Sequence, residues 1–393
     1  MKIKAISRSN KLILPIIIFS QFCCTSLWFA GNSIIDDLIL VFNINSQSLG
    51  YISASVQFGF IIGTFVFALL TLSDRFSPSK VFFICAILGA FFNFGMLNAN
   101  NSILTLICFR FFTGFCLAGI YPVGMKIAAD HFEKGLGKSL SFLVGALVLG
   151  TAFPHLIKSF GLNIRWEIVI WTTSILTVIG GLLILIFVPN GPYQKLANKF
   201  DVSKILKVFK NRSFRSAAFG YFGHMWELYA FWTFVPVLLL TYSELHTVEH
   251  NISLFSFIII ASGTISCILG GFISNTYGTK KTAVLSLSLS GLCCLLSPFF
   301  FLINSSIIFI TFLIIWGMVV IADSPLFSTL VAQNSDAQSK GTALTIVNCI
   351  GFAITIVSIQ LLNFLISNTN YTQYAFLILA IGPIVGLISL KKS

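Results

Sequence analysis

Long apolar stretches alternate with short polar segments along nearly the whole chain. Each stretch has about 18 or more residues, enough to cross the roughly 30 Å of bilayer hydrocarbon as a helix. The stretches lie near 12–31, 49–72, 81–98, 102–127, 139–160, 166–188, 215–240, 253–274, 281–303, 306–333, 341–366 and 373–390. Because a backbone inside a bilayer must satisfy its own hydrogen bonds, the pattern predicts an all-α membrane protein with twelve transmembrane helices.

The twelve stretches divide into two sets of six. The sixth stretch is followed by Pro189-Asn-Gly-Pro192 and by a basic segment that runs to Arg215. This composition predicts one bundle at 1–190, a basic cytoplasmic linker at 191–213 and a second bundle at 214–393. The linker is interpreted either as a short amphipathic helix on the anionic membrane surface or as a solvated connection.

A polar hinge of similar sequence occurs once in each set. Asp74-Arg-Phe-Ser-Pro-Ser-Lys80 follows the second stretch, and Asn275-Thr-Tyr-Gly-Thr-Lys-Lys281 follows the eighth. Pro122 and Pro325 stand at corresponding places in the fourth and tenth stretches. Repetition at a nearly fixed offset predicts a parallel duplication of a six-helix unit.

Composition restricts the chain to a membrane. Hydrophobic residues make up 56% of the 393 residues and charged residues 9%, which is too little polar side chain for the surface of a soluble protein. Topology explains the formal charge of +12, because most of the 24 basic residues lie on the inner side if the N-terminus is inside. Both termini are therefore expected in the cytoplasm, and nucleic-acid binding is disfavoured. The nine cysteines lie in apolar stretches without metal-site spacing, so no metal or other cofactor is expected.

The hinge resembles the signature loop of the major facilitator superfamily, roughly G-x-L-x-D-R-x-G-R-K. The matching residues are Asp74, Arg75 and Lys80 in the first copy and Gly271, Gly278, Lys280 and Lys281 in the second. Leu70 and Ser77 stand where glycines are usual in the family. Arg110-Phe-Phe-Thr-Gly114 is similar to a second family motif. The resemblance implies two six-helix bundles around a central cavity that is lined by the first, fourth, seventh and tenth helices.

The same hinge is the predicted cytoplasmic gate. Asp74 is expected to lie against the positive end of a helix, and Arg75 and Lys80 are within plausible reach of Asp130 or Glu133. Such contacts would hold the cytoplasmic side closed. The alternative is that the basic residues only anchor the loop on the inner side. In the second copy, Gly278, Lys280 and Lys281 are interpreted as a flexible turn anchored at the membrane.

Several ionisable residues fall inside apolar stretches, where a charge is costly and a functional role is the first hypothesis. Glu227, near the middle of the seventh stretch, is predicted to couple protons or to bind substrate, and His224, one turn earlier, to pair with it. Arg110 is predicted to be a mobile counter-charge or an anion site. For Asp323, a structural bond and a binding role both stay open, and the following proline is expected to break its helix. His155 is interpreted as a helix-packing residue.

Polar and aromatic residues offer candidates for the cavity wall. Gln21, Trp28 and Asn32 recur at intervals of seven and four and would share one face of a helix, while Trp226 and Tyr229 flank Glu227. Groups of this kind would orient a small hydrophilic solute. Hydrogen bonds between helices and an interfacial tryptophan are the alternative interpretation.

These features indicate a secondary transporter of a small polar or anionic metabolite in a bacterial inner membrane. We expect it to be coupled to protons and to work as a monomer by alternating access. The sequence contains no nucleotide-binding loop and no recognisable catalytic set, so neither ATP-driven transport nor an enzyme is expected. A proton-driven efflux antiporter, a passive facilitator and a non-transporting membrane sensor stay open as alternatives.

Overall fold

A computed structural model describes residues 3–45, 47–132, 136–161, 165–194, 208–335, 340–369 and 371–391, and every regular element within these ranges is a helix. Long helices satisfy all their backbone groups internally, which the apolar composition requires. The α-helices are α1 (Ile3–Thr25), α2 (Ile35–Phe42), α3 (Ser48–Leu69), α4 (Leu72–Arg75), α5 (Pro78–Phe94), α6 (Ile103–Ala118), α7 (Tyr121–His131), α8 (Leu136–Ser159), α9 (Trp166–Phe187), α11 (Arg212–His246), α12 (Ile252–Tyr277), α13 (Thr279–Phe301), α14 (Ser306–Ala322), α15 (Ser324–Gln333), α16 (Lys340–Asn368), α17 (Thr372–Ala375) and α18 (Ile381–Lys391). Three 3₁₀ turns are η1 (Asn32–Ile34), η2 (Gly95–Leu97) and η3 (Phe376–Ala380).

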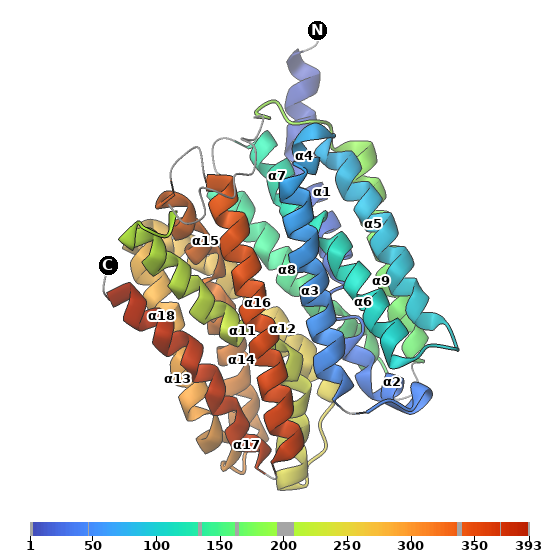
Figure 1. The fold of residues 1–393 in the computed structure, drawn as a ribbon, viewed down its shortest axis with the longest axis vertical. Coiled ribbons are helices and arrows are strands. Elements are labelled where there is room, and N and C mark those ends of the chain that lie inside the picture. The colour runs from blue at the N-terminus through green and yellow to red at the C-terminus, as the bar shows by residue number, and fades with distance from the viewer. Residues whose placement is uncertain are drawn as a thin grey trace.

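The predicted spans are confirmed as helical segments. Eleven helical segments among the described residues, from Ser48–Leu69 to Thr372–Lys391, are long and apolar enough to cross a membrane, and Leu12–Thr25 is a shorter apolar helix. Together they form two six-helix bundles, which Figure 1 shows side by side in blue to green and in yellow to red. We call them the first half (α1–α9) and the second half (α11–α18).

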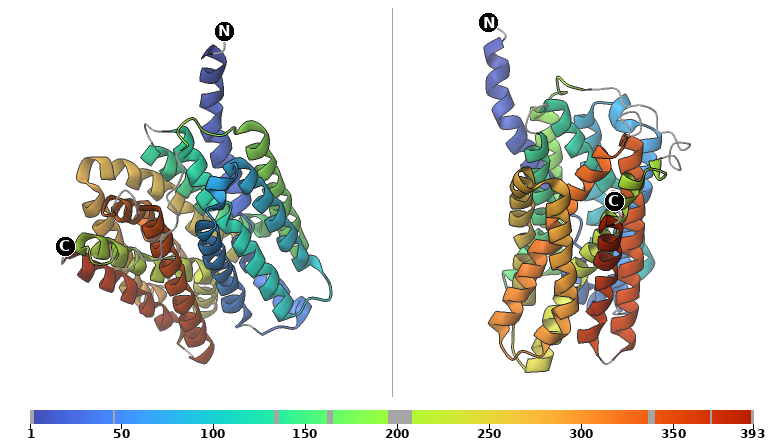
Figure 2. Two further views of the ribbon diagram at one scale, coloured as in Figure 1. Left: turned by 45° about the horizontal axis from the view of Figure 1, so that its top comes forward. Right: turned by 90° about the vertical axis from the view of Figure 1, so that its left-hand side faces the viewer.

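The two halves meet along two pairs of helices. Helix α3 contacts α16, and α8 contacts α12, and the views of Figures 1 and 2 agree that α3 and α16 run side by side. We call the end of the molecule that carries α4 the hinge end, and the opposite end, with α2 and α17, the far end (Figure 1). At the far end the Gln360 Nε2 donates to the Gly50 carbonyl at 2.9 Å and the Asn363 Nδ2 donates to the Gln47 carbonyl at 3.1 Å.

Two spans are broken at corresponding places, which gives the faint proline repeat a structural meaning. The fourth span changes from α6 to α7 after Gly119, and Pro122 lies in the first turn of α7. The tenth span changes from α14 to α15 at Asp323, and Pro325 lies in the first turn of α15. Proline lacks a backbone donor and is tolerated at a helix start, so both residues restart a helix inside the membrane. The expected break at Asp323 is confirmed.

The first span differs from the prediction. Helix α1 ends at Thr25, residues 26–31 form turns, and Asn32 already belongs to η1. The shared helix face that was predicted for Gln21, Trp28 and Asn32 is therefore wrong, because the chain unwinds between the first residue and the other two. Most of the predicted linker, along with Glu133, lies outside the described residues.

The two hinges use different local geometries. In the first, Thr71 adopts a positive φ of 49°, α4 makes one short helical segment, and Pro78 begins α5. In the second, Gly278 alone separates α12 from α13, with φ 89° and ψ 143°. That combination is accessible essentially only to glycine, so the glycine in this copy of the hinge is a conformational requirement.

Candidate functional site

A cavity of about 1200 Å³ lies between the two halves and reaches the hinge end. Its wall combines residues of the first half, such as Tyr121 and Leu147, with residues of the second, such as Tyr221, Tyr229 and Asn348. Residues near the hinges, including Asp74, Asn275 and Thr279, line its mouth. The chain therefore encloses a space of the size used for small solutes, open on one side.

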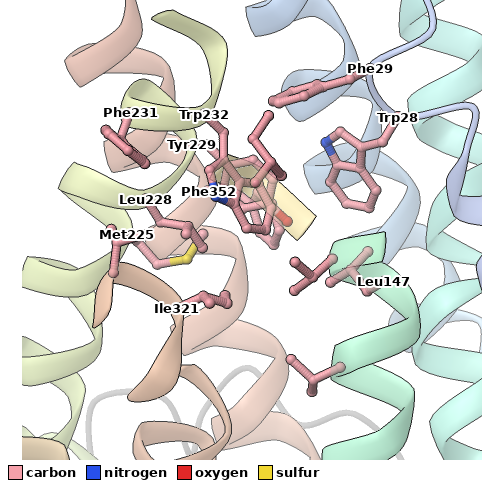
Figure 3. Close-up of a cluster of buried hydrophobic side chains, with 14 of the residues drawn as sticks. Trp28, Phe29, Leu147, Met225, Leu228, Tyr229, Phe231, Trp232, Ile321 and Phe352 are labelled. Carbon is pink, nitrogen blue, oxygen red and sulfur yellow. The ribbon is translucent and has the colours of Figure 1, made fainter. Parts of the chain in front are cut away.

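A layer of aromatic rings separates the cavity from the far end, and Figure 3 shows its members Trp28, Tyr229 and Phe352 close together. Trp28 from the unwound end of α1 stacks on Tyr229 of α11, with ring centroids 5.6 Å apart, and on Phe352 of α16 at 5.9 Å. Phe60 of α3 contacts both Trp28 and Phe352, at 5.0 and 4.6 Å. Tyr229 and Phe352 line the cavity, whereas the buried Trp28 stands behind them. Rings from both halves thus form one barrier across the path.

The charged groups on the described cavity wall lie at its mouth. Lys126 Nζ of α7 lies 2.8 Å from Asp74 Oδ1 and 3.7 Å from Asp130 Oδ2. Arg75 and Lys80 are exposed and make no ion pair with Asp130 while the cavity is open, so their contacts in a closed state stay a prediction. In this state Lys126 contacts Asp130, because it is one helical turn away on the same face.

This charged cluster does not join the two halves. Asp74, Lys126 and Asp130 all belong to the first half, and they are in contact while the cavity is open beside them. The cluster therefore ties the hinge to α7 in this state. In the second copy, Lys281 is exposed and the Gly278 backbone stands in open space. The gating roles of Arg75, Lys80, Gly278, Lys280 and Lys281 stay predictions.

Arg110 is completely buried and holds the unwound end of α1. Its Nη2 donates to the carbonyls of Leu27, at 2.9 Å, and of Trp28, and its Nη1 donates to Asn93 Oδ1 at 3.2 Å. Carbonyls at a helix end lack intrahelical donors, and the guanidinium supplies them. Arg110 contacts no carboxylate among the described residues, and these fixed contacts favour a structural role over a mobile counter-charge.

Glu227 lies inside the second half and pairs with neither His224 nor Arg110. Trp316 Nε1 of α14 donates to Glu227 Oε1 at 2.7 Å, and Ser290 Oγ of α13 donates to Oε2 at 2.9 Å. The side chain is buried and stands behind the cavity wall. The predicted Glu227–His224 pair is wrong, because donors from two other helices occupy both carboxyl oxygens.

His224 instead faces Asp323 at the break between α14 and α15. His224 Nδ1 lies 2.7 Å from Asp323 Oδ1, and both side chains are buried. Ile321, Ser324 and Pro325, which flank the carboxyl in sequence, line the cavity, so the pair lies directly behind its wall. The second half thus holds two buried carboxyl groups and one imidazole close to the cavity.

The remaining candidates are distributed differently from the prediction. Of the five predicted cavity residues, Tyr229 is on the described wall, whereas Gln21, Trp28 and Asn32 are buried away from it and Trp226 Nε1 donates to the Ile378 carbonyl at 3.0 Å. Sequence reasoning overlooked the wall residues Tyr121, Tyr221, Asn348 and Lys126. Lys126 could have been recognised, since a cation inside an apolar stretch is as informative as Arg110.

Comparison with known proteins agrees with this architecture. Residues 17–359 match the model of the Major Facilitator Superfamily, while no curated protein sequence matches the chain. A bacterial homologue of the human lysosomal transporter Spinster, inward-facing and unoccupied, is 14% identical with a TM-score of 0.65, over 98% of this chain and 95% of that chain. The proton:xylose symporter XylE, bound to 6-bromo-6-deoxy-D-glucose, is 14% identical with a TM-score of 0.68, over 98% and 96% of the two chains. The human organic anion transporter MFSD10 (TETRAN) is 13% identical with a TM-score of 0.72, over 97% and 99%.

At these identities the solved structures establish a common fold, and the family match covers most of the chain. The chain is a multi-pass membrane protein of two six-helix bundles and belongs to the major facilitator superfamily.

Proposed function

We propose that this protein is a proton-coupled secondary transporter of a small polar metabolite. The observation that carries the proposal is the cavity between the two halves, which is open at the hinge end and closed by the aromatic layer toward the far end. Rocking of the halves about this cavity would expose it to each side of the membrane in turn. An enzyme is not proposed, because the family consists of transporters.

The cavity wall favours an uncharged solute over an anionic one. Beyond the cluster at the mouth, its described residues are aromatic, apolar or neutral and polar. Tyr221 donates to Asn348 Oδ1 at 2.8 Å, and Tyr121 and Tyr229 contribute two further phenol groups to the wall. The structural neighbours include both a sugar symporter and an organic anion transporter, so they do not distinguish an uncharged substrate from an anionic one. We therefore base the proposed substrate class on the residues of the cavity wall.

Proton coupling is proposed for the buried acids of the second half. Asp323 and His224 form one buried pair, and Glu227 is a second buried carboxyl group in the same half. No lysine or arginine contacts either carboxyl group among the described residues, so a proton can occupy this cluster without displacing a fixed cation. Asp323 lies at the break between α14 and α15 beside the cavity wall. A change in its protonation would therefore alter the contacts at this junction.

The basic residues of the inner segments support a position in the cytoplasmic membrane of a bacterium, with both termini inside. The hinge end, with Arg75 and Lys80, then faces the cytoplasm. A carrier of this size encloses its own cavity, so we propose a functional monomer that needs no cofactor.

Uptake into proteoliposomes tests the transport proposal. Purified protein should move a radiolabelled solute from a panel of small polar metabolites, faster with an inward proton gradient than without one. If no solute in the panel is transported, a non-transporting sensor is favoured. If the rate of uptake is the same with and without the proton gradient, proton coupling is excluded and a passive facilitator is favoured.

Glu227→Gln tests the proposed proton site. The substitution keeps the shape and one acceptor oxygen but cannot bind a transferable proton, so we expect gradient-driven uptake to fall by at least about tenfold while counterflow continues. Glu167→Gln is the matched control, because that carboxylate pairs with Arg165 outside the cavity. Full gradient-driven uptake by Glu227→Gln would exclude Glu227 from coupling.

A further inference from the structure

The face of α8 that lines the cavity continues toward the far end with buried polar groups. Val144 and Leu147 are on the cavity wall, and Thr151 and His155 follow on the same face one and two turns further on. Both side chains are at most 2% exposed, and Thr151 Oγ1 and His155 Nε2 have no hydrogen-bond partner among the described residues.

Helix α3 shows the same continuation on the opposite side of the seam. Thr64 lines the cavity, Phe60 belongs to the aromatic layer, and Gln57 comes next on this face. Gly50, two turns beyond Gln57, packs against Asn363 of the second half, which shows that the face is directed at the seam. Gln57 is fully buried, and neither its Nε2 nor its Oε1 has a partner in the described structure.

The unwound end of α1 and helix α11 complete the group. Asn32 Nδ2 donates to Ser53 Oγ at 2.6 Å, and Ser53 Oγ donates to the Leu49 carbonyl, so Asn32 Oδ1 is left as a free acceptor. Trp28 Nε1 is a buried donor without a partner in the described part of the chain. On α11, Trp232 lies two turns beyond the cavity residue Met225 and contacts the ring of Phe29, and its Nε1 likewise finds no partner among the described residues.

Unpaired polar atoms of this kind are costly. Each buried donor or acceptor without a partner disfavours the folded state, so their collection along one seam calls for a ligand that pairs them. The guanidinium of Arg110 is held by the carbonyls of Leu27 and Trp28 and by Asn93, and only its Nε, beside Gly31, has no partner among the described residues. Neither a lysine nor a carboxylate belongs to the group.

We propose that these residues form a second solute site, which we call the far-end site, made by Trp28, Asn32, Gln57, Thr151, His155 and Trp232. The aromatic layer separates it from the open cavity in this state. Its occupant is an uncharged polyhydroxylated solute, because a hydroxyl group both donates and accepts, as the mixture of unpaired indole, amide and hydroxyl groups requires. The tryptophan rings offer apolar surfaces for the C–H faces of such a molecule. This inference rests on the proposed transport function and names the substrate class of the same pathway.

Calorimetric titration of the purified full-length protein with alditols and cyclitols tests the far-end site, with hexuronates as the anionic comparison. We expect at least one uncharged polyol to bind, and Gln57→Leu to weaken that binding by about tenfold, which corresponds to the loss of one or two hydrogen bonds. The melting temperature of the solute-free Gln57→Leu variant should not fall, because the substitution removes polar atoms that have no partner. Trp28→Phe, which removes the indole donor and part of the buried ring, should also weaken binding.

Asn101→Leu is the matched control. Its amide donates to the carbonyls of Gly95 and Met96 within the first half and does not cross the seam, so this variant should lose stability but keep its polyol affinity. The proposal is overturned if no uncharged polyol binds, or if Gln57→Leu lowers stability as Asn101→Leu does and leaves affinity unchanged. Polyol binding without uptake would instead contradict the transport proposal. If neither Gln57→Leu nor Trp28→Phe changes the rate of uptake, the far-end site alone is contradicted.

Discussion

At the scale of single residues, Arg110 shows how a buried charge can serve the backbone. The turns at 26–31 leave carbonyls without helical donors, and the guanidinium pairs with two of them and with Asn93. Only a planar group with several donors can reach these acceptors at once. The unwound segment that places Trp28 in the aromatic layer therefore depends on a residue in another helix.

Arg110→Leu should destabilise the protein. The substitution leaves the carbonyls of Leu27 and Trp28 without their side-chain donor, and we expect a loss of about 2–3 kcal/mol in the free energy of unfolding, with Arg110→Lys in between. The measurement is thermal unfolding in detergent. Arg165→Leu, which removes an exposed arginine, should leave the melting temperature nearly unchanged. Equal melting temperatures for Arg110→Leu and Arg165→Leu would contradict the structural role of Arg110.

Sequence reasoning identified the buried ionisable residues but not their partners. Glu227, Asp323 and Arg110 are conspicuous in any apolar stretch, because a charge there is costly. Glu227 contacts Trp316 and Ser290, and Arg110 contacts Asn93, which are ordinary residues of other helices. Asp323 contacts His224, which the sequence had suggested as a partner of Glu227. Which side chains meet is decided by the rotation of each helix about its own axis in the bundle. Helices that are apolar on every side give no signal in the sequence for that rotation.

At the scale of elements, the breaks in the helices determine where the site residues lie. Span positions could be predicted because a run of apolar residues has to be helical in a bilayer. Pro325 likewise indicated the break at Asp323, whereas the corresponding break at Gly119, beside Pro122, was not predicted. The end of α1 at Thr25 gave no such signal, since residues 26–31 are as apolar as the helix before them and only tertiary contacts unwind them.

Gly278→Ala should destabilise the protein, although an added methyl group would meet no atom. The position has φ 89°, where a side chain costs about 1–3 kcal/mol, so the melting temperature should fall. Gly137→Ala is the matched control, because that glycine also stands in open space but within α8, where alanine is the better helix former. A fall of similar size in both variants would show that the backbone angle at Gly278 is not the cause.

At the scale of the whole molecule, the two halves separate at one end and touch at the other. The hinge end opens into the cavity, while hydrogen bonds from Gln360 and Asn363 close the far end. For a solute to pass the aromatic layer, the protein must adopt a second conformation, in which the far-end contacts break. The polar groups of the far-end site and the wall of the open cavity would then be exposed in alternation.

A disulfide across the far end should stop transport. A Cβ at Gly50 would lie 3.0 Å from the Asn363 Cβ, near the separation that a disulfide needs, so Gly50→Cys with Asn363→Cys can join α3 to α16. Oxidation should abolish uptake in proteoliposomes and reduction should restore it, because the far end can then no longer open. Asn363→Cys alone is the matched control, since it places the same thiol on α16 without a thiol at Gly50 and leaves the halves free to move. Continued uptake through a fully oxidised Gly50–Asn363 pair would show that solute crosses this protein without separation of α3 from α16.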